Sequence, residues 1–136
     1  MSRLENINLF VTGVLVGLIW IIQLLHYPVF IFISPDQFLA FHDYHTYYMG
    51  FIAAPLMVIE LALSFYLGLQ NRKYILPLLI VILIWISTFL IQVPLHEQLA
   101  KEMQVTTINK LIDTNWIRTI LWSSKATLLL YWYQKQ

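Results

Sequence analysis

The stretch ILPLLIVILIWISTFLI, residues 75–91, contains no charged side chain and no continuous polar face. A helix on the surface of a soluble bundle needs polar residues along one side. A helix that crosses a bilayer instead needs about 20 mostly apolar residues, because each residue rises about 1.5 Å through about 30 Å of hydrocarbon. Extended to residues 74–95, the stretch has that length, and we predict a transmembrane helix there.

Three further apolar runs have a similar length, at residues 9–33, 47–69 and 116–133. The last run is the least apolar, since Arg118 and Lys125 interrupt it. The connections between the runs are short enough for consecutive helices to lie side by side and antiparallel. We therefore predict an all-α integral membrane protein, a four-transmembrane-helix bundle with up-down-up-down order.

The composition supports a membrane protein of one domain. Of the 136 residues, 60% are hydrophobic and 11% are charged, against about 25% charged residues in an average soluble domain. A net charge of +1 argues against a nucleic-acid partner, which requires a concentrated basic face. Cysteine is absent, so disulfides and thiolate ligands are excluded. We predict that residues 1–136 form a single domain, multi-pass in the cell membrane, with the lipid bilayer as its partner.

Lysine and arginine residues indicate the orientation, because they are enriched on the cytoplasmic side of membrane proteins. With both termini in the cytoplasm, four basic residues lie on the inner side and two on the outer side. The inner ones are Arg3, Arg72, Lys73 and Lys135, and the outer ones are Lys101 and Lys110. This bias predicts that both termini are cytoplasmic.

Local signals set the expected helix boundaries. The sequence Ser34-Pro35-Asp36-Gln37 contains a capping serine, a proline at the first helical position and a glutamine that can complete a capping box. The second helix is therefore expected to run from Pro35 to about Leu69. Pro28 can end the first helix early. Residues 96–115 alternate polar and apolar side chains, and we expect a helix there that rests on the outer surface.

One polar layer is predicted near the outer mouth of the bundle. Residues that face each other across an antiparallel turn have numbers that add to a constant, so the turns give the relative depth of each residue. Polar residues of all four helices, including every histidine of the chain, then lie at a similar depth. They are Gln23, His26, His42, Asp43, His45, Gln92, His96, Asn115 and Arg118. Most have a neighbour three or four residues away on the same helix, as a shared face requires.

This layer predicts a functional site. His26, His42, His45 and His96 are candidate ligands of haem or of a transition metal such as iron, copper or zinc. Arg118 would orient an anionic or carbonyl oxygen of a small lipophilic substrate. Without a cofactor, a histidine would act as general base. The leading hypothesis is a membrane oxidoreductase or oxygenase. The alternatives are that the histidines are a solvated interfacial group and that Arg118 extends to the headgroups.

A second polar layer lies deeper, where Glu60 and Lys125 are predicted to share a depth and to interact. Ionisable groups within a membrane helix are costly, so they are usually paired or functional. These two residues, with Arg118 and Asn115, are the candidate catalytic residues. The alternatives are that Glu60 and Lys125 form a structural ion pair, or that they form a proton, ion or small-molecule path with Arg118.

Two further possibilities concern partners. The pair Gly13 and Gly17 has the spacing of small residues at helix contacts, and it predicts either close packing within the bundle or a homo-oligomer. Transport would need an oligomer, because four helices leave little room for a gated path in a monomer. The chain can also be a non-catalytic accessory subunit of a membrane assembly.

Several strings resemble an uncharacterised bacterial family of four-helix membrane proteins. They are Phe41-His42 to Tyr44-His45, Pro55-Leu56-Met57 to Glu60, Val93-Pro94-Leu95-His96 and Asn115-Trp116-Ile117-Arg118-Thr119 to Trp122. In size and layout the chain is also distantly similar to the anthrone-oxygenase-like membrane proteins. That resemblance implies oxidation of a small quinoid or polyketide-like molecule. It assigns no role to a single residue.

Overall fold

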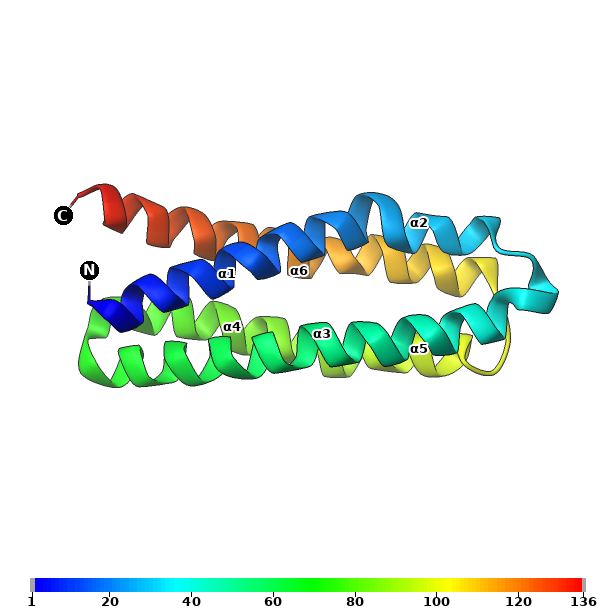
Figure 1. The fold of residues 1–136 in the computed structure, drawn as a ribbon, viewed down its shortest axis with the longest axis horizontal. Coiled ribbons are helices and arrows are strands. Elements are labelled where there is room, and N and C mark those ends of the chain that lie inside the picture. The colour runs from blue at the N-terminus through cyan, green and yellow to red at the C-terminus, as the bar shows by residue number, and fades with distance from the viewer. Residues whose placement is uncertain (1, 136) are drawn as a thin grey trace.

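A computed structural model describes residues 2–135 as four long helical segments connected by short turns (Figure 1). The first segment joins α1 (Arg3–Ile21), η1 (Ile22–His26), α2 (Tyr27–Val29) and η2 (Phe30–Phe32); the second is α3 (Pro35–Gln70); the third joins η3 (Arg72–Tyr74), α4 (Ile75–Ser87), η4 (Thr88–Gln92) and α5 (Val93–Leu99); the fourth is α6 (Val105–Gln134). The described part of the chain contains no strand, which confirms the predicted all-α class.

The four segments run alternately up and down, and the two termini lie at the same end of the bundle (Figure 1). The first segment packs against α3 and α6, and α4 also packs against both of them. Each segment thus has two neighbours around a common core, which is the packing of an up-down four-helix bundle. The predicted start of the second helix is confirmed, since α3 begins at Pro35 and ends at Gln70.

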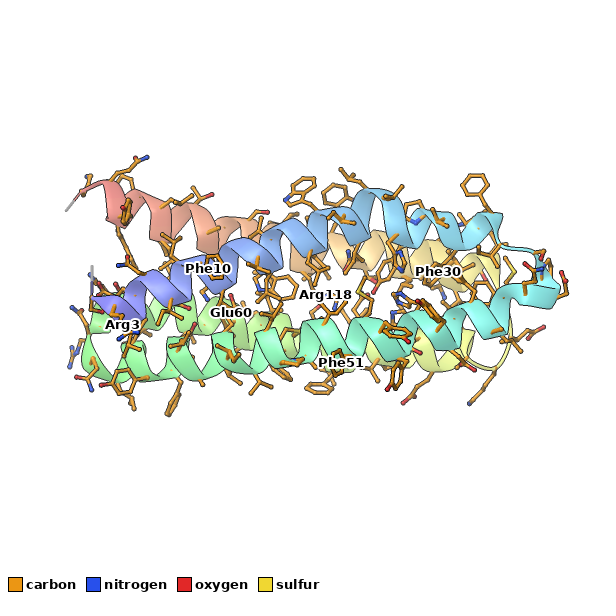
Figure 2. All side chains as sticks on the ribbon, viewed as in Figure 1. Arg3, Phe10, Phe30, Phe51, Glu60 and Arg118 are labelled. Carbon is orange, nitrogen blue, oxygen red and sulfur yellow. The ribbon has the colours of Figure 1, made fainter. Side chains whose placement is uncertain are left out.

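Unlike a soluble protein, the bundle buries charged side chains and exposes many large apolar ones. Lys125, Glu60 and His42 are almost completely buried, with 0%, 1% and 1% of their surface exposed, whereas Phe10 and Phe51 are 72% and 74% exposed. Figure 2 shows Glu60 and Arg118 between the helices and Phe51 at the outer edge of α3. Large apolar side chains cover the outside of every helix. Such a surface is suited to lipid contact, because an apolar patch of this extent is rare on soluble monomers.

Three helical segments of the described chain are long and apolar enough to cross a membrane: Arg3–Phe32, Pro35–Gln70 and Arg72–Leu99. The fourth segment, α6, has the length but not the apolar composition. The two charged residues within its predicted span 116–133, Arg118 and Lys125, are both buried. Part of the low hydropathy of α6 therefore comes from charges that face the interior of the bundle.

Two helices continue through proline by forming a wider π-helical turn. One such turn, η1, precedes Pro28, and the other, η4, precedes Pro94. Proline has no N–H to donate, and a wide turn changes the hydrogen-bond register around that gap. As a result the first segment continues to Phe32, and Pro28 does not end it. Both turns carry polar residues of the predicted layer, Gln23 in η1 and Gln92 in η4.

The expectation that residues 96–115 rest on the outer surface is wrong for most of this range. α5 ends at Leu99, and α6 begins at Val105. Ile108 and Leu111 in the first turns of α6 are completely buried in the core. The first turns of α6 are amphipathic: their apolar side packs into the bundle, and the polar residues that suggested a surface helix lie on the other side.

The glycine pair on α1 does not contribute to packing within the bundle. A Cβ atom added at Gly13 or at Gly17 would meet no other atom within 4 Å. Both residues are exposed on the outside of the bundle. A homo-oligomer through this face stays a prediction.

The deeper layer is a sealed ion pair, which confirms the predicted contact between Glu60 and Lys125. The Lys125 Nζ atom lies 2.8 Å from Glu60 Oε1 and 3.1 Å from Ser64 Oγ. Glu60 also accepts hydrogen bonds from Thr12 Oγ1, at 2.9 Å, and from Trp122 Nε1, at 2.9 Å. Every charged atom of the pair thus has a polar partner, as burial of an ion pair requires.

Candidate functional site

The four histidines meet in one cluster, contributed by three helical segments. His26 Nε2 lies 2.6 Å from His45 Nδ1, and His42 Nε2 lies 3.0 Å from His96 Nδ1. The rings of His45 and His96 stack at a centroid separation of 5.4 Å and join the two pairs. The predicted convergence of the histidines is therefore confirmed. The alternative of a solvated interfacial group does not hold for His42 and His45, which are 1% and 5% exposed.

The predicted metal centre of His26, His42, His45 and His96 is not formed in this arrangement. Two nitrogen ligands of one tetrahedral zinc ion lie roughly 3.4 Å apart, since each Zn–N bond is about 2.0–2.1 Å long. The nitrogens of both histidine pairs are closer and point at each other, as hydrogen-bonded rings do. No group of three or more His, Cys, Asp or Glu side chains among residues 2–135 is placed to hold a metal ion. Haem binding stays a prediction that this geometry does not address.

Arg118 lies beside the histidine cluster and is 7% exposed. Its Nη2 atom donates to Asn115 Oδ1 at 2.6 Å, to Gln92 Oε1 at 3.2 Å and to Tyr27 Oη at 3.2 Å. Its Nε atom donates to the same Asn115 oxygen at 3.0 Å. All of these acceptors are neutral. The guanidinium is thus held in a fixed orientation without losing its net positive charge to a partner.

No carboxylate of the described residues forms an ion pair with Arg118. The ion pairs within the described residues are Lys73–Glu5 and Lys125–Glu60, and Arg118 takes part in neither. An uncompensated charge inside an apolar bundle is expensive, which is why ionisable groups in such positions mark functional sites. Arg118 therefore has the properties of a binding residue for an anion or a polarised oxygen. Because it is buried, the alternative that it extends to the headgroups does not hold.

The orientation of Arg118 is fixed by residues that are themselves held. Asn115 Nδ2 donates to Gln23 Oε1 at 2.8 Å, and Gln23 Nε2 donates to the backbone oxygen of Ile112 at 3.1 Å. Gln92 Nε2 donates to Thr114 Oγ1 at 3.0 Å. Each π-helical turn thus contributes one glutamine to this network: Gln92 of η4 accepts from Arg118 directly, and Gln23 of η1 holds Asn115. Asn115 positions Arg118 and does not line the cavity described below.

A continuous row of hydrogen bonds leads from Arg118 to His42. Arginine can only donate, so the Tyr27 hydroxyl accepts from Arg118 and keeps its own hydrogen for His96 Nε2, 3.1 Å away. His96 then carries its proton on Nδ1 and donates it to His42 Nε2. In this direction the remaining proton of His42 is on Nδ1. If both imidazoles adopt the other tautomer, His42 Nδ1 presents a lone pair instead.

His42 Nδ1, the last atom of this row, is buried and has no hydrogen-bond partner within the described part of the chain. A buried polar atom without a partner costs free energy, typically about 1–3 kcal/mol. The atom can serve as a donor or as an acceptor, depending on the tautomer of the row. His42 therefore keeps one ring nitrogen that is not used in hydrogen bonding within the described chain.

A cavity of about 460 Å³ provides the space for a small molecule. Ligand pockets for small molecules typically have about 300–1,000 Å³. One part of the lining is polar and the rest is apolar. The polar residues include Tyr27, His42, His45, Thr46, Thr88, Gln92, His96, Glu97 and Arg118, and the apolar ones include Met49, Gly50, Ala53, Ala54, Met57, Trp85 and Phe89.

The cavity exists because α3 carries small residues where it faces η4 and α4. Gly50, Ala53 and Ala54 line it, and a Cβ atom added at Gly50 would meet nothing within 4 Å. Phe89, on the opposite wall, is 57% exposed on the outside of the bundle. The cavity therefore borders the apolar outer surface, from which a lipophilic molecule can enter.

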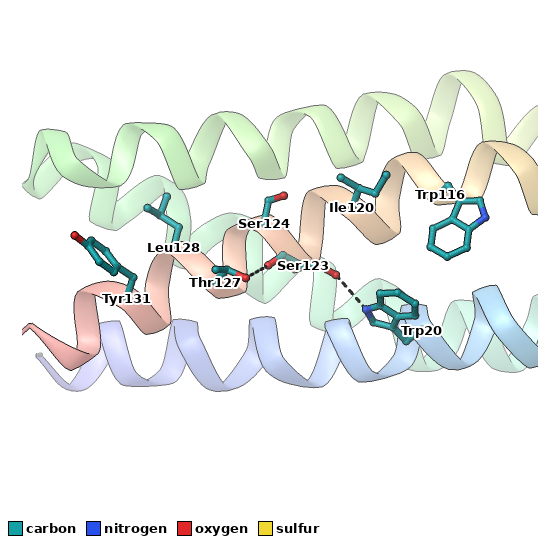
Figure 3. Close-up of a pocket in the computed structure, with 8 residues that line it drawn as sticks. All are labelled: Trp20, Trp116, Ile120, Ser123, Ser124, Thr127, Leu128 and Tyr131. Atoms are coloured by element: carbon teal, nitrogen blue, oxygen red, sulfur yellow. Dashed lines mark hydrogen bonds between the residues drawn. The ribbon is translucent and has the colours of Figure 1, made fainter.

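A second hollow lies on the outside of α1 and α6 and has different chemistry (Figure 3). Its volume is about 610 Å³, and Trp20, Trp116 and Tyr131 contribute its aromatic lining. The Trp20 indole donates to Ser123 Oγ at 3.1 Å. No histidine and no charged residue lines this groove. It has the lining of a lipid-facing groove, and we place the functional site at the polar cavity.

Sequence reasoning brought together most of this site but not all of it. Glu60 and Lys125, predicted as catalytic residues, are absent from the cavity lining and bind each other. Asp43, predicted for the polar layer, is exposed. Tyr27 and Trp85 were missed, because aromatic residues in a membrane protein are usually assigned to the interface. The position of Tyr27 between His26 and Pro28 is the signal that could have identified it.

Comparison with known proteins adds no assignment. No family model, no curated protein and no solved structure matches the chain. The resemblances noted in the sequence stay predictions, and the function must be inferred from the geometry of the cavity.

The two buried cations of α6 should respond differently to neutralisation. Lys125→Gln leaves Glu60 buried without a counter-ion and should reduce the free energy of unfolding by about 3–5 kcal/mol. Arg118→Gln removes a buried charge that has no counter-ion, which is favourable, but it also takes donors from the oxygens of Asn115 and Gln92. These two effects oppose each other, so the loss of unfolding free energy should be smaller than for Lys125→Gln. Urea unfolding of the protein in mild detergent, followed by tryptophan fluorescence, measures both values.

The double variant Glu60→Gln with Lys125→Met is the matched control, since it removes both charges and should recover part of the loss. Equal destabilisation by Arg118→Gln and Lys125→Gln would contradict the distinction between a binding cation and a structural one.

Proposed function

We propose that this protein is a membrane-embedded enzyme that binds a small lipophilic molecule with an anionic or carbonyl oxygen and moves a proton to or from it. The observation that carries the proposal is Arg118, a buried guanidinium that has only neutral partners and lines a mostly apolar cavity. An oxygen with negative charge, or one that gains negative charge during a reaction, is the partner that this cation lacks.

The polar and the apolar parts of the cavity lining would each bind a different part of the ligand. An apolar ring or chain of the ligand would lie against Met49, Met57 and Phe89, and its oxygen would accept from Arg118. Burial of apolar surface favours binding by roughly 25 cal/mol per Å². A hydrogen bond between charged partners contributes about 1.5–3 kcal/mol. The site thus selects molecules that are apolar over most of their surface and acidic or carbonyl-bearing at one end.

The proposed chemistry involves His42, which lines the cavity together with Arg118 and whose Nδ1 atom has no partner within the described chain. With the row in the tautomer that leaves Nδ1 unprotonated, His42 removes a proton from the carbon beside a carbonyl group. The electron pair of that C–H bond then becomes part of an enolate, whose oxygen carries the negative charge that Arg118 stabilises. The proton stays on the imidazole, which shares the positive charge with His96 through their hydrogen bond. Reversal of the step returns the proton.

Removal of a proton is also the first step in the oxidation of phenols and enols. The proposal therefore agrees with the oxidoreductase or oxygenase predicted from the sequence and with the quinoid class that the resemblance implies. It assigns no step to a metal, because the histidine nitrogens are paired with each other.

Transport along Glu60, Lys125 and Arg118 is the alternative with less support. Glu60 and Lys125 are sealed among Thr12, Ser64 and Trp122, and neither residue lines the cavity that contains Arg118. A transport path for ions or protons needs side chains that bind the transported species weakly enough to release it. The ion pair instead has the saturated hydrogen bonding of a structural element.

We further propose that all four helical segments span the membrane with both termini in the cytoplasm. The apolar exterior and the three strongly apolar segments support insertion, and the polar face of α6 is directed into the bundle. The excess of lysine and arginine at the end that contains the termini supports this orientation. The histidine cluster would then lie toward the outer face of the cell membrane.

Single cysteines test the orientation, since the chain has none of its own. In intact cells, a membrane-impermeant maleimide should label Ala40→Cys and Val105→Cys but not Arg3→Cys or Arg72→Cys. All four replaced residues are exposed, so disrupted cells should label every variant. Labelling of Arg72→Cys in intact cells would invert the proposed topology.

Ligand binding is tested with three probes that share one ring system: 2-naphthoate, 2-naphthol and naphthalene. Isothermal titration calorimetry of the protein in lipid nanodiscs should give affinities in that order. Arg118→Gln should weaken 2-naphthoate about 10- to 100-fold, since a charge-assisted hydrogen bond contributes about 1.5–3 kcal/mol. It should have little effect on naphthalene.

A matched pair of glycine variants shows whether the probes bind in the cavity. Gly50→Leu places a side chain inside the cavity and should abolish binding of all three probes. Gly17→Leu also meets open space, but on the outside of α1, and should leave binding unchanged. Equal binding to the Gly50 and Gly17 variants would locate the probes elsewhere and contradict the proposed site.

Proton transfer is tested by deuterium exchange at carbon 1 of 2-tetralone, a ketone with an acidic C–H group. In D₂O the protein should accelerate the exchange above the buffer rate, as measured by mass spectrometry. His42→Ala should remove this acceleration by a factor of about 10²–10⁴, the usual contribution of a general base. His26→Ala is the control, because His26 does not line the cavity. Exchange that is unaffected by His42→Ala would exclude His42 as the base.

A further inference from the structure

The cavity is a channel that follows the bundle axis. Its lining extends from His42 to Met57 on α3 and from Trp85 to Ala100 on the third helical segment, at every turn of both. Each wall is roughly 22 Å long, since 15 residues rise by about 1.5 Å each. A volume of about 460 Å³ drawn out over that length is narrow. The shape therefore suits a chain-like molecule.

The two ends of the channel lie at different depths in the bundle. α3 and the third segment are antiparallel and joined by a short turn, so Met57 and Trp85 mark one end, and His42 and Ala100 mark the other. Trp85 is near the middle of the third segment. The end at Ala100 is the end of the bundle away from the chain termini (Figure 1). The channel thus leads from one face of the bundle to its middle.

The deep end presents mainly carbon to a ligand. The Trp85 Nε1 atom is buried, so the indole reaches the channel with its ring carbons, and it packs against Phe89 at a centroid separation of 5.4 Å. The Thr88 hydroxyl also lines this part, but it donates to the backbone oxygen of Ile84 at 2.8 Å. Its hydrogen is therefore used within the helix, and this end is suited to an apolar chain.

Arg118 lies part-way along the channel, well above the deep end. It donates to Gln92, which follows Trp85 by seven residues on the same segment. At about 1.5 Å per residue, the two levels are roughly 10 Å apart. A ligand whose oxygen binds Arg118 therefore has roughly 10 Å of mostly apolar channel between that oxygen and the deep end.

The side of the channel is open to the lipid. Gly50, Ala54 and Phe89 line it and are also exposed on the outside of the bundle. A lipid has its polar group at the membrane surface and its chain in the hydrocarbon core. The channel has the same polarity, because its polar residues lie toward the bundle end and its apolar residues toward the middle. A lipid-like molecule can thus move sideways from the adjacent leaflet into the channel without turning over.

We propose that the ligand is a single-chain amphiphile, a long-chain carboxylic acid or carbonyl compound that enters from the adjacent leaflet. Its oxygen end binds Arg118, and its chain lies between α3 and α4 as far as Met57 and Trp85. The inference rests on the proposed function, because it assumes that Arg118 binds the oxygen of the ligand. It adds the chain, the direction of the chain and the route of entry.

Bromine atoms quench tryptophan fluorescence on contact, so a brominated chain reports where it lies. The protein in lipid nanodiscs is titrated with 9,10-dibromostearate, which carries its bromines at mid-chain. Quenching of Trp85 is the difference between the natural protein and Trp85→Phe. This difference should saturate with concentration. In Arg118→Gln, the concentration for half-saturation should rise about 10- to 100-fold, because the charge-assisted hydrogen bond is lost.

Two alanines of α3 provide a matched pair of variants. Ala54→Phe places a ring in the channel and should abolish the saturable quenching. Ala62→Phe is the control, since Ala62 is exposed on the same helix but does not line the channel. It should leave the saturable quenching unchanged.

Quenching that rises without saturation and is the same in Arg118→Gln reports ordinary contact with bilayer lipid and overturns the inference. If 2-naphthoate binds in an Arg118-dependent way while dibromostearate shows no saturable quenching, the inference fails and the proposed function stands. Failure of both probes to bind the natural protein overturns the two together.

Discussion

The guanidinium of Arg118 lies inside a bundle whose outer surface is apolar, and every acceptor that it reaches within the described chain is neutral. Much of the site can be understood from this one constraint. Asn115, Gln92 and Tyr27 hold the charge without neutralising it, and Gln23 holds Asn115 in turn. The wide turns before Pro28 and Pro94 supply both glutamines. A hydrogen-bond network of this kind is costly to build in a membrane protein, and it leaves the cation available to a molecule in the cavity.

Lys125, on the same helix, is a buried cation with a structural role, because it has a counter-ion. Two turns further along α6, its ammonium group binds Glu60 at 2.8 Å, and the carboxylate has further donors in Thr12 and Trp122. Removal of one partner from such a pair is far more damaging than removal of both. In the proposed function the two cations separate stability from ligand binding: Lys125 is saturated by the protein, whereas Arg118 has only neutral partners within the described chain.

The sequence predicts much of this arrangement because a membrane helix restricts where polar residues can lie. The uncharged run 75–91 indicated the fold class, and counting residues across turns placed His26, His42, His45 and His96 at one depth and Glu60 beside Lys125. Depth alone does not give the direction of a ring nitrogen, so the histidines were expected to hold a metal, whereas the structure pairs them. The cavity was also not predictable, because it depends on which face Gly50 and Ala53 present to η4. Segment 96–115 was misplaced because an amphipathic pattern does not distinguish a surface helix from one that lines a polar core.

Arg118 and His42 are proposed to bind the oxygen end of a lipophilic molecule together. The most direct measurement is an experimental structure of the protein in a lipid nanodisc with 2-naphthoate bound. In that structure the carboxylate should lie within hydrogen-bonding distance of the Arg118 guanidinium and beside His42, with the rings between α3 and α4. A carboxylate bound at Lys101 or Lys110, or rings seated in the outer groove of α1 and α6 with Arg118 unliganded, would contradict this proposal.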